Sequence, residues 1–158
     1  MIEAHEMKRT LTEIVIDPSH VDRAETPEFR QSKKRLIEDG HHKCWTCGTE
    51  EDIQIHHRAA EWMFANDVDF SLMKEYCEEN DTYGYGRLLK AKPITSVDDI
   101  RNCQALCRQH HIEKGTGIHE LTYSAWLMQK LAKAGCDPVP QNGQTVEQVL
   151  DGMKALES

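Results

Sequence analysis

The chain has 158 residues, of which 39% are hydrophobic and 29% are charged, a balance typical of one globular domain. It has no apolar run long enough to cross a membrane, and its N-terminus lacks the apolar stretch of a secretory signal, so we expect a cytoplasmic protein without a membrane partner. The formal net charge of −8 argues against a protein that coats nucleic acid, because such binding depends on many Lys and Arg residues.

The first part of the chain, residues 1–40, predicts an N-terminal extension made of a strand and a helix. Residues 10–16 alternate weakly in hydrophobicity, as a short strand does. Thr26, followed by proline, is a typical helix N-cap, and the helix is expected to end at Gly40. The helix carries the most basic cluster of the chain, residues 30–35, which we interpret either as a solvated face or as a contact to a DNA backbone.

The middle of the chain, residues 41–120, predicts a compact core interrupted by a helical insertion at about 58–95. The alternating residues 53–56 predict a strand, and the apolar run 103–107 predicts a strand or turn that leads into a short helix. Within the insertion, helices are expected over residues 58–66 and 69–79.

The last part, residues 121–158, predicts C-terminal helices. Residues 122–134 and 145–156 have amphipathic patterns, and a segment rich in proline and glycine joins them. We therefore expect an α+β fold whose core is flanked by additional helices.

Two short pairs of metal-ligating residues have the same spacing. Cys44 and Cys47 enclose two residues and precede a glycine, and Cys107 and His110 again enclose two residues. Three thiolates and one imidazole form the closed tetrahedral set of a structural zinc site. In a reducing compartment such pairs indicate zinc more often than disulfides. Buried free thiols beside surface histidines are the alternative.

Adjacent histidines stand beside this predicted zinc site. His56 and His57 end the predicted strand, and adjacent strand residues face opposite sides. His111 follows the predicted ligand His110 in a short helix, where neighbouring positions differ by about 100°. One imidazole of each pair can therefore bind a metal while its neighbour points elsewhere. His56 in place of His110 as the fourth zinc ligand is the alternative.

Together these motifs resemble the HNH, or ββα-metal, nuclease family over residues 44–119. The likeness rests on the CxxC turn, the His-His pair, Asn102 five residues before Cys107, and Lys114 three residues after His111. A narrower likeness is to small HNH proteins encoded by bacteriophages, in which a Gly-Ile-His segment and a later Trp126 follow the core. The resemblance implies a ββα-metal core with a Cys3His zinc knuckle, in a bacterium or a phage-infected cell.

The resemblance also implies roles for single residues. His57 would be the general base that activates water, and Asn102 would hold the loop in shape and help to orient it. His56 and His111 would bind the catalytic metal, with His119 as a candidate third ligand. Phosphate contacts would come from two basic residues, Lys114 and Arg108.

The long separation between the two predicted strands departs from a minimal hairpin. Residues 58–95 could form a specificity element or a lid, or could accompany an altered active site. Two or three imidazole ligands favour a softer metal such as Mn, Ni or Zn over Mg for the catalytic position.

The sequence therefore predicts a metal-dependent endonuclease that hydrolyses DNA, together with a protein partner if targeting has to be supplied. A non-catalytic zinc module that acts in protein interaction or regulation is the alternative that the negative charge favours. A sequence-specific DNA-binding regulator is a third hypothesis, opposed by the lack of a broad basic face.

Overall fold

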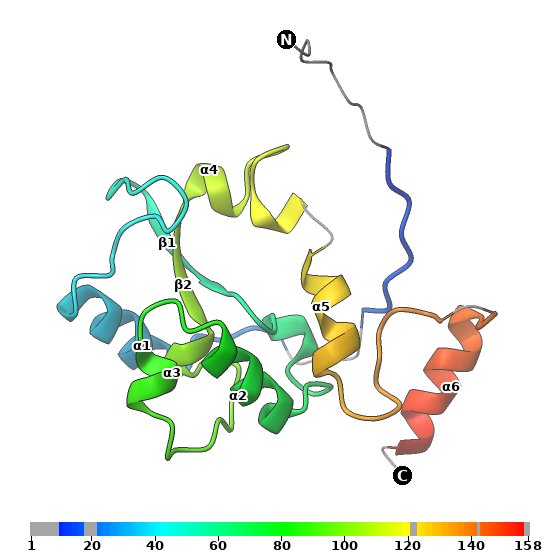
Figure 1. Cartoon of the computed structure of the whole chain (residues 1–158). Coiled ribbons are helices and arrows are strands. Elements are labelled where there is room, and N and C mark those ends of the chain that lie inside the picture. Colours follow the sequence, from blue (N-terminus) through cyan, green and yellow to red (C-terminus); the bar gives the residue numbers. More distant parts are fainter. Residues whose placement is uncertain (1–9, 18–21, 121–122, 142, 157–158) are drawn as a thin grey trace, which may run out of the picture.

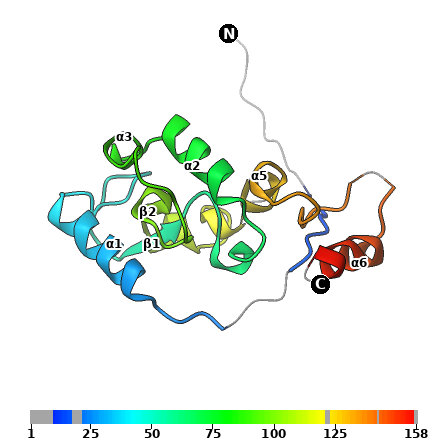
Figure 2. The same cartoon turned by 90° about the horizontal axis from the view of Figure 1, so that it is seen from below.

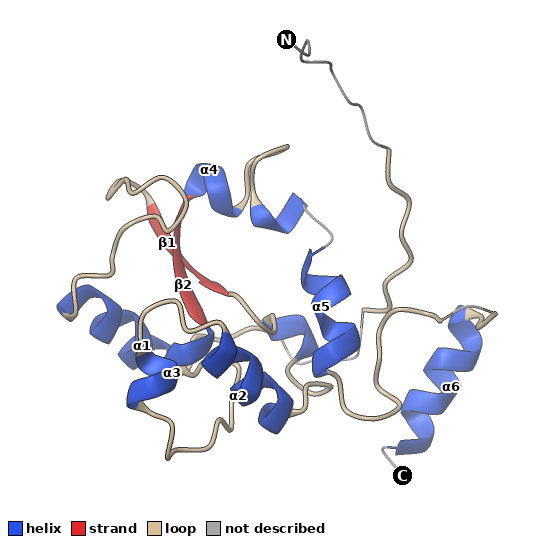
Figure 3. Ribbon diagram, viewed as in Figure 1, coloured by secondary structure: helices blue, strands red, loops and turns tan. Residues whose placement is uncertain are grey.

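The computed structural model describes residues 10–17, 22–120, 123–141 and 143–156, which form a mixed α+β fold (Figure 1). Its described strands make one small antiparallel sheet, surrounded by helices and long loops (Figure 3). In chain order the elements are α1 (Pro27–Glu38), β1 (Ile53–His57), η1 (Trp62–Phe64), α2 (Phe70–Glu79), α3 (Tyr85–Leu88), η2 (Ile100–Asn102), β2 (Cys103–Cys107), α4 (Arg108–His111), η3 (Ile118–Glu120), α5 (Tyr123–Leu131) and α6 (Val146–Leu156).

The sheet consists of β1 and β2, which pair although the whole insertion separates them in sequence. Their register sets His56 opposite Gln104 and His57 opposite Cys103. Because neighbouring residues of a strand face opposite sides, His56 and Gln104 share one side of the sheet, and His57 and Cys103 share the other. Helix α4 follows β2 directly, which gives the strand, strand and helix order expected from the sequence.

Helix α1 is part of the core rather than an appended extension. It begins as predicted, with the Thr26 hydroxyl accepting a hydrogen bond from the Phe29 backbone N–H at 3.0 Å. Its Phe29 and Leu36 are buried in one cluster with Ile100 and Cys103. The helix therefore covers the side of the sheet to which His57 belongs.

The insertion builds the larger hydrophobic core. Helix α2 forms as predicted, because the Asp69 carboxylate accepts hydrogen bonds from the first backbone N–H groups of the helix. Its buried Met73 and Cys77 pack in one cluster with residues of helix α5, which follows the sheet in sequence. These residues are Leu127, Met128 and Leu131.

The helix predicted over residues 58–66 is wrong, because the structure has there only the 3-10 turn η1. The backbone N–H groups of Ala59 and Ala60 donate to the side-chain oxygen of Asn102, at 2.7 and 3.2 Å, instead of entering a helix. A long-range contact thus overrides the local helical preference of this segment.

Arg101 anchors the end of the insertion. Its guanidinium donates to the backbone carbonyls of Leu89, Lys92 and Pro93 at 2.8 to 3.1 Å, and it pairs with the Asp99 carboxylate at 2.8 Å. The side chain is buried, so these bonds compensate for the loss of its hydration. They fix the loop that returns the chain to β2.

The strand predicted over residues 10–16 does not form. The described residues 10–17 run without secondary structure and meet the C-terminal linker through one hydrogen bond, from the Ile16 N–H to the Pro138 carbonyl at 2.8 Å. Helix α6 does form, and the side chains of Thr145 and Gln148 cap it reciprocally. In two perpendicular views α6 lies away from the sheet, beyond α5 (Figures 1 and 2).

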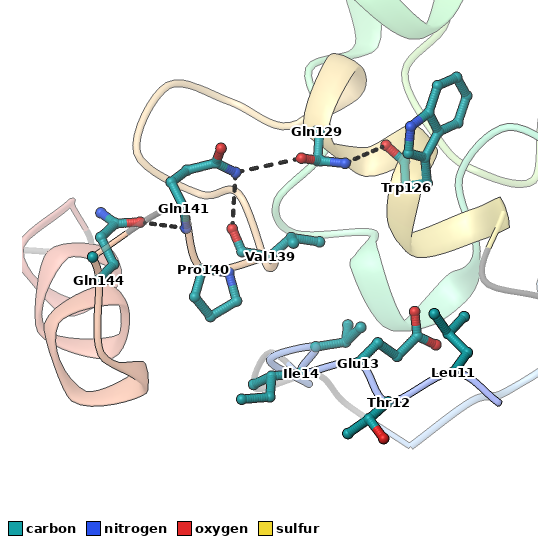
Figure 4. Close-up of a pocket in the computed structure, with 12 residues that line it drawn as sticks. Leu11, Thr12, Glu13, Ile14, Trp126, Gln129, Val139, Pro140, Gln141 and Gln144 are labelled. Carbon is teal, nitrogen blue, oxygen red and sulfur yellow. Dashed lines mark hydrogen bonds between the residues drawn. The ribbon is translucent and has the colours of Figure 1, made fainter.

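A cavity of about 530 Å³ lies beside this C-terminal part and not at the sheet. Figure 4 shows Leu11 and Ile14 on one side of it and Trp126 and Gln129 of α5 on another. Its lining holds no group of metal-ligating side chains. Among the described helices, none is both long and apolar enough to cross a membrane.

Candidate metal centres

Three thiols and one imidazole converge at the end of the sheet, in the group predicted from the sequence. Cys44 and Cys47 lie in the turn that follows α1, Cys107 ends β2, and His110 lies in α4. Their ligand atoms all lie within 4.8 Å of one another. Gly48 permits the turn, because it adopts a left-handed φ of 75° that disfavours a side chain.

The spacing of this Cys3His group fits a zinc ion. A tetrahedral zinc with bonds of about 2.3 Å to sulfur separates two sulfur ligands by about 3.8 Å. The Cys47 and Cys107 sulfur atoms are 3.9 Å apart, and the Cys107 sulfur lies 3.3 Å from His110 Nδ1. The group can therefore hold a metal such as zinc without rearrangement. His56, the alternative fourth ligand, lies elsewhere.

A second group consists of His56, His111 and His119, whose ring nitrogens also lie within 4.8 Å of one another. They come from β1, α4 and η3, and the Nε2 atoms of His111 and His119 are 2.9 Å apart. His110 and His111 therefore serve different groups, as the 100° rotation between helix neighbours predicts. The structure brings His119 to this group despite the two intervening glycines.

Two side chains orient the histidines of this second group from outside. Gln54 Oε1 lies 2.6 Å from His111 Nδ1, which leaves His111 Nε2 to face the centre of the group. The Glu61 carboxylate lies 3.2 Å from His119 Nδ1, which likewise leaves His119 Nε2 to face the centre of the group. Amide and carboxylate partners of this kind fix the tautomer and the ring direction of metal-ligating histidines.

The electrostatics of the three histidines also suit a cation. Burial, followed by the charge of His119, lowers the pKa of His56 to about 3 and that of His111 to about 4, so both rings are neutral ligands at pH 7. The hydrogen bond that His119 donates to the Glu61 carboxylate raises the pKa of His119. Among the described residues, buried His56 Nε2 has no hydrogen-bond partner. A metal ion at the centre of the group would satisfy it.

His57 lies on the opposite side of β1 and is held from two directions. Its Nε2 lies 2.8 Å from the Asp98 carboxylate, and its ring stacks on Phe29 with the ring centres 4.8 Å apart. Thr26 donates a further hydrogen bond to Asp98 at 2.7 Å. Burial alone would raise the pKa of Asp98, but the bonds from His57 and Thr26 outweigh it and hold that pKa below its usual value.

His57 and the three-histidine group meet at one cavity of about 140 Å³. Its lining also includes Arg23, an exposed cation that precedes α1 and lies 5.3 Å from the Phe29 ring centre. The sequence predicts no functional role for Arg23, Gln54 or Asp98, and Glu61 resembles a solvated helix residue. Only the folded chain brings these four to the histidines.

Asn102 holds the loop after β1 rather than touching the His57 ring. Its oxygen accepts the N–H groups of Ala59 and Ala60, and its nitrogen donates to the carbonyls of Ala60 and Val97 at 2.9 and 2.7 Å. The predicted loop-holding contacts are present, while the direct partner of His57 is Asp98.

The two basic residues predicted to meet phosphate lie outside this cavity. Arg108 is exposed and pairs with Glu113 at 3.0 Å, and Lys114 is also exposed. Neither lines the cavity, and Arg23 is the cation that does so among the described residues.

Comparison with models of known protein families, with curated proteins and with solved structures found no match to this chain.

Proposed function

We propose that the protein is a metal-dependent endonuclease of the HNH type, which hydrolyses phosphodiester bonds in DNA. The observation that carries the proposal is the cavity where three converging imidazoles lie beside a separate histidine–carboxylate pair. A closed structural site needs only the Cys3His group. A second, histidine-only group beside a candidate base supports a catalytic centre.

The geometry of His57 suits a general base. With Nε2–H donated to Asp98, the lone pair of Nδ1 is the one that can take a proton from water. The negative carboxylate then stabilises the imidazolium that forms.

The other residues of the cavity would bind and partly neutralise the negative charge of the substrate phosphate. A divalent metal bound to His56, His111 and His119 would supply Lewis-acid stabilisation of the phosphate and of the leaving oxygen. Arg23 is placed to contact a phosphate oxygen at the cavity's rim. Imidazole ligands favour Mn, Ni or Zn over Mg. DNA, rather than RNA, is the substrate that the HNH resemblance implies.

The test is plasmid cleavage by the wild type and by His57→Ala with Mg, Mn, Ni and Zn, with bound zinc counted in both proteins. We expect cleavage by the wild type, and a loss of about 100-fold or more in the variant with zinc retained at the Cys3His group. Absence of cleavage by folded, zinc-loaded wild type with every metal would reject the proposal.

The net charge of −8 supports a second candidate, a zinc module that acts through a protein partner. The two candidates differ in what the three histidines do. A pure interaction module would keep its partner binding after His56→Ala and His111→Ala, whereas a nuclease would lose its activity.

A further inference from the structure

A separate cavity of about 390 Å³ lies next to both metal-ligating groups. It is formed by the Cys-rich turn, β2, the C-terminal end of α2 and the start of η3, elements whose places Figure 1 shows. In the sequence, Trp45 lies between two residues of the Cys3His group, and Ile118 directly precedes His119. Across the sheet, Gln104 is paired in register with His56. Directly opposed strand residues have Cβ atoms about 5 Å apart. The cavity lined by Gln104 is therefore adjacent to the three-histidine group through His56.

The most informative residue of this cavity is Gln104. Its side chain is only 8% exposed as a whole, and it lines this cavity. A carboxamide supplies one acceptor oxygen and two N–H donors, so a side chain in this place is suited to pairing with a polar ligand. Gln104 is therefore a donor and acceptor that lines the cavity.

The remaining lining is aromatic, polar and free of carboxylates. Trp45 is 62% exposed, although it belongs to a turn that the Cys3His group restrains. Arg58 is buried with its guanidinium 5.9 Å from the Tyr76 ring centre, and Nε donates to the Arg101 carbonyl. Further lining residues are Asn80 and Thr82. In a chain of net charge −8, a cavity with one cation and no acid fits a polar, flat and uncharged or anionic ligand.

We propose that this cavity binds a nucleobase of the substrate strand, one or two nucleotides from the phosphate held at the histidines. The base stacks on the Trp45 indole, and its polar edge pairs with the Gln104 carboxamide. Aromatic side chains bind unpaired bases by stacking, and carboxamides offer the paired donor and acceptor that base edges complement. The inference rests on the proposed nuclease function, which supplies the substrate. It also gives the insertion a role in binding that substrate, because the lining residues Tyr76, Asn80 and Thr82 belong to the insertion.

The structure supplies a matched control for the stacking residue. Trp126 is exposed to the same extent, 62%, but it lines the large cavity beside α5. The comparison of Trp45→Ala with Trp126→Ala therefore separates loss of this site from loss of any exposed indole. Gln104→Met is the second variant, because it keeps the side-chain volume and removes the hydrogen-bonding groups of the carboxamide.

The experiment measures anisotropy of labelled single-stranded homopolymers of dA, dC or dT with zinc-loaded His57→Ala protein, and cleavage of the same strands by the wild type. We expect about 10- to 100-fold weaker binding with Trp45→Ala, the range that one stacked base supplies, and no change with Trp126→Ala. With Gln104→Met we expect the preference among the three bases to disappear, while thermal stability is kept.

The outcomes separate this inference from the proposed function. Cleavage by the wild type with equal binding by Trp45→Ala and Trp126→Ala would overturn the nucleobase site and leave the nuclease in place. Binding that depends on Trp45 and Gln104, without cleavage under any metal, would support the site and reject the nuclease. A fall in stability with Gln104→Met and an unchanged base preference would show a packing residue and overturn its assigned role.

Discussion

Asp98 is the residue on which the direction of the His57 ring depends. It occupies Nε2 of His57, which leaves Nδ1 as the ring nitrogen whose lone pair could accept a proton. No motif points to Asp98, because its contact with His57 joins two residues that are distant in sequence. The sequence predicts the histidine, and only the fold supplies its partner.

Replacement of Asp98 by Asn should therefore slow cleavage without unfolding the protein. The new amide would donate to Nε2 and hold the ring in the tautomer with Nδ1 protonated, which cannot accept a proton from water. We expect the cleavage rate to fall about 100- to 10,000-fold with zinc content unchanged. Glu113→Gln, which removes a carboxylate outside the cavity, is the control. An equal rate for Asp98→Asn and wild type would show that Asp98 does not act through His57.

Cys77 gives the protein a defined sensitivity to alkaline pH. Burial raises the pKa of its thiol from 9.0 to about 11, so the folded protein holds this proton more tightly than the unfolded chain. The associated stability is complete below about pH 9 and is lost as pH rises towards 11, with a size of about 2 to 3 kcal/mol. Urea unfolding at pH 8 and pH 10.5 should show a smaller fall for Cys77→Ala than for the wild type. Parallel falls would contradict the assignment.

At the scale of elements, the sheet depends on how the insertion is closed. The sequence predicts both strands, helix α2 and the caps of α1 and α6, because each has a local pattern. It does not predict the absence of a helix at 58–66 or the missing strand at 10–16. In both segments the backbone bonds to distant partners, Asn102 in the first and Pro138 in the second.

Asn102→Ala should destabilise the fold as a whole. The change leaves the N–H groups of Ala59 and Ala60 buried without acceptors, so we expect a loss of about 3 kcal/mol or more in the free energy of unfolding. Asn102→Asp should also destabilise, because a carboxylate would face the carbonyls of Ala60 and Val97. Urea denaturation measures both.

The exposed Asn80, which makes one local bond at the end of α2, provides the control for this series. Asn80→Ala should change the free energy of unfolding by about 1 kcal/mol or less. A loss of similar size for Asn80→Ala and Asn102→Ala would mean that Asn102 has no special part in closing the insertion.

At the scale of the whole molecule, the Cys3His group joins three parts of the chain. It connects the turn after α1 with the end of β2 and with α4. A structural zinc contributes on the order of 10 kcal/mol, which is comparable with the entire stability of a domain. The group should therefore decide whether the rest of the chain folds.

Cys47→Ser should abolish cooperative unfolding and lose the structural zinc. Cys136→Ser is the control, because Cys136 is a cysteine that lies outside both candidate metal-ligating groups. Thermal unfolding followed by circular dichroism, with zinc counted in each protein, measures the effect. A cooperative transition in Cys47→Ser near the wild-type temperature would show that the fold does not depend on the metal.

The sequence by itself predicted the mixed α+β class and the Cys3His group that could bind a metal such as zinc, because these depend on short spacings between residues of distinctive chemistry. Cys44, Cys47, Cys107 and His110 could be paired by spacing, and His111 by its place beside His110. The tertiary structure alone brought Arg23, Asp98 and Glu61 to the histidines and Gln104 to the cavity beside Trp45, since such contacts join segments whose separation in sequence carries no signal. Local patterns report local geometry, whereas a site built across an insertion exists only after the chain has closed around it.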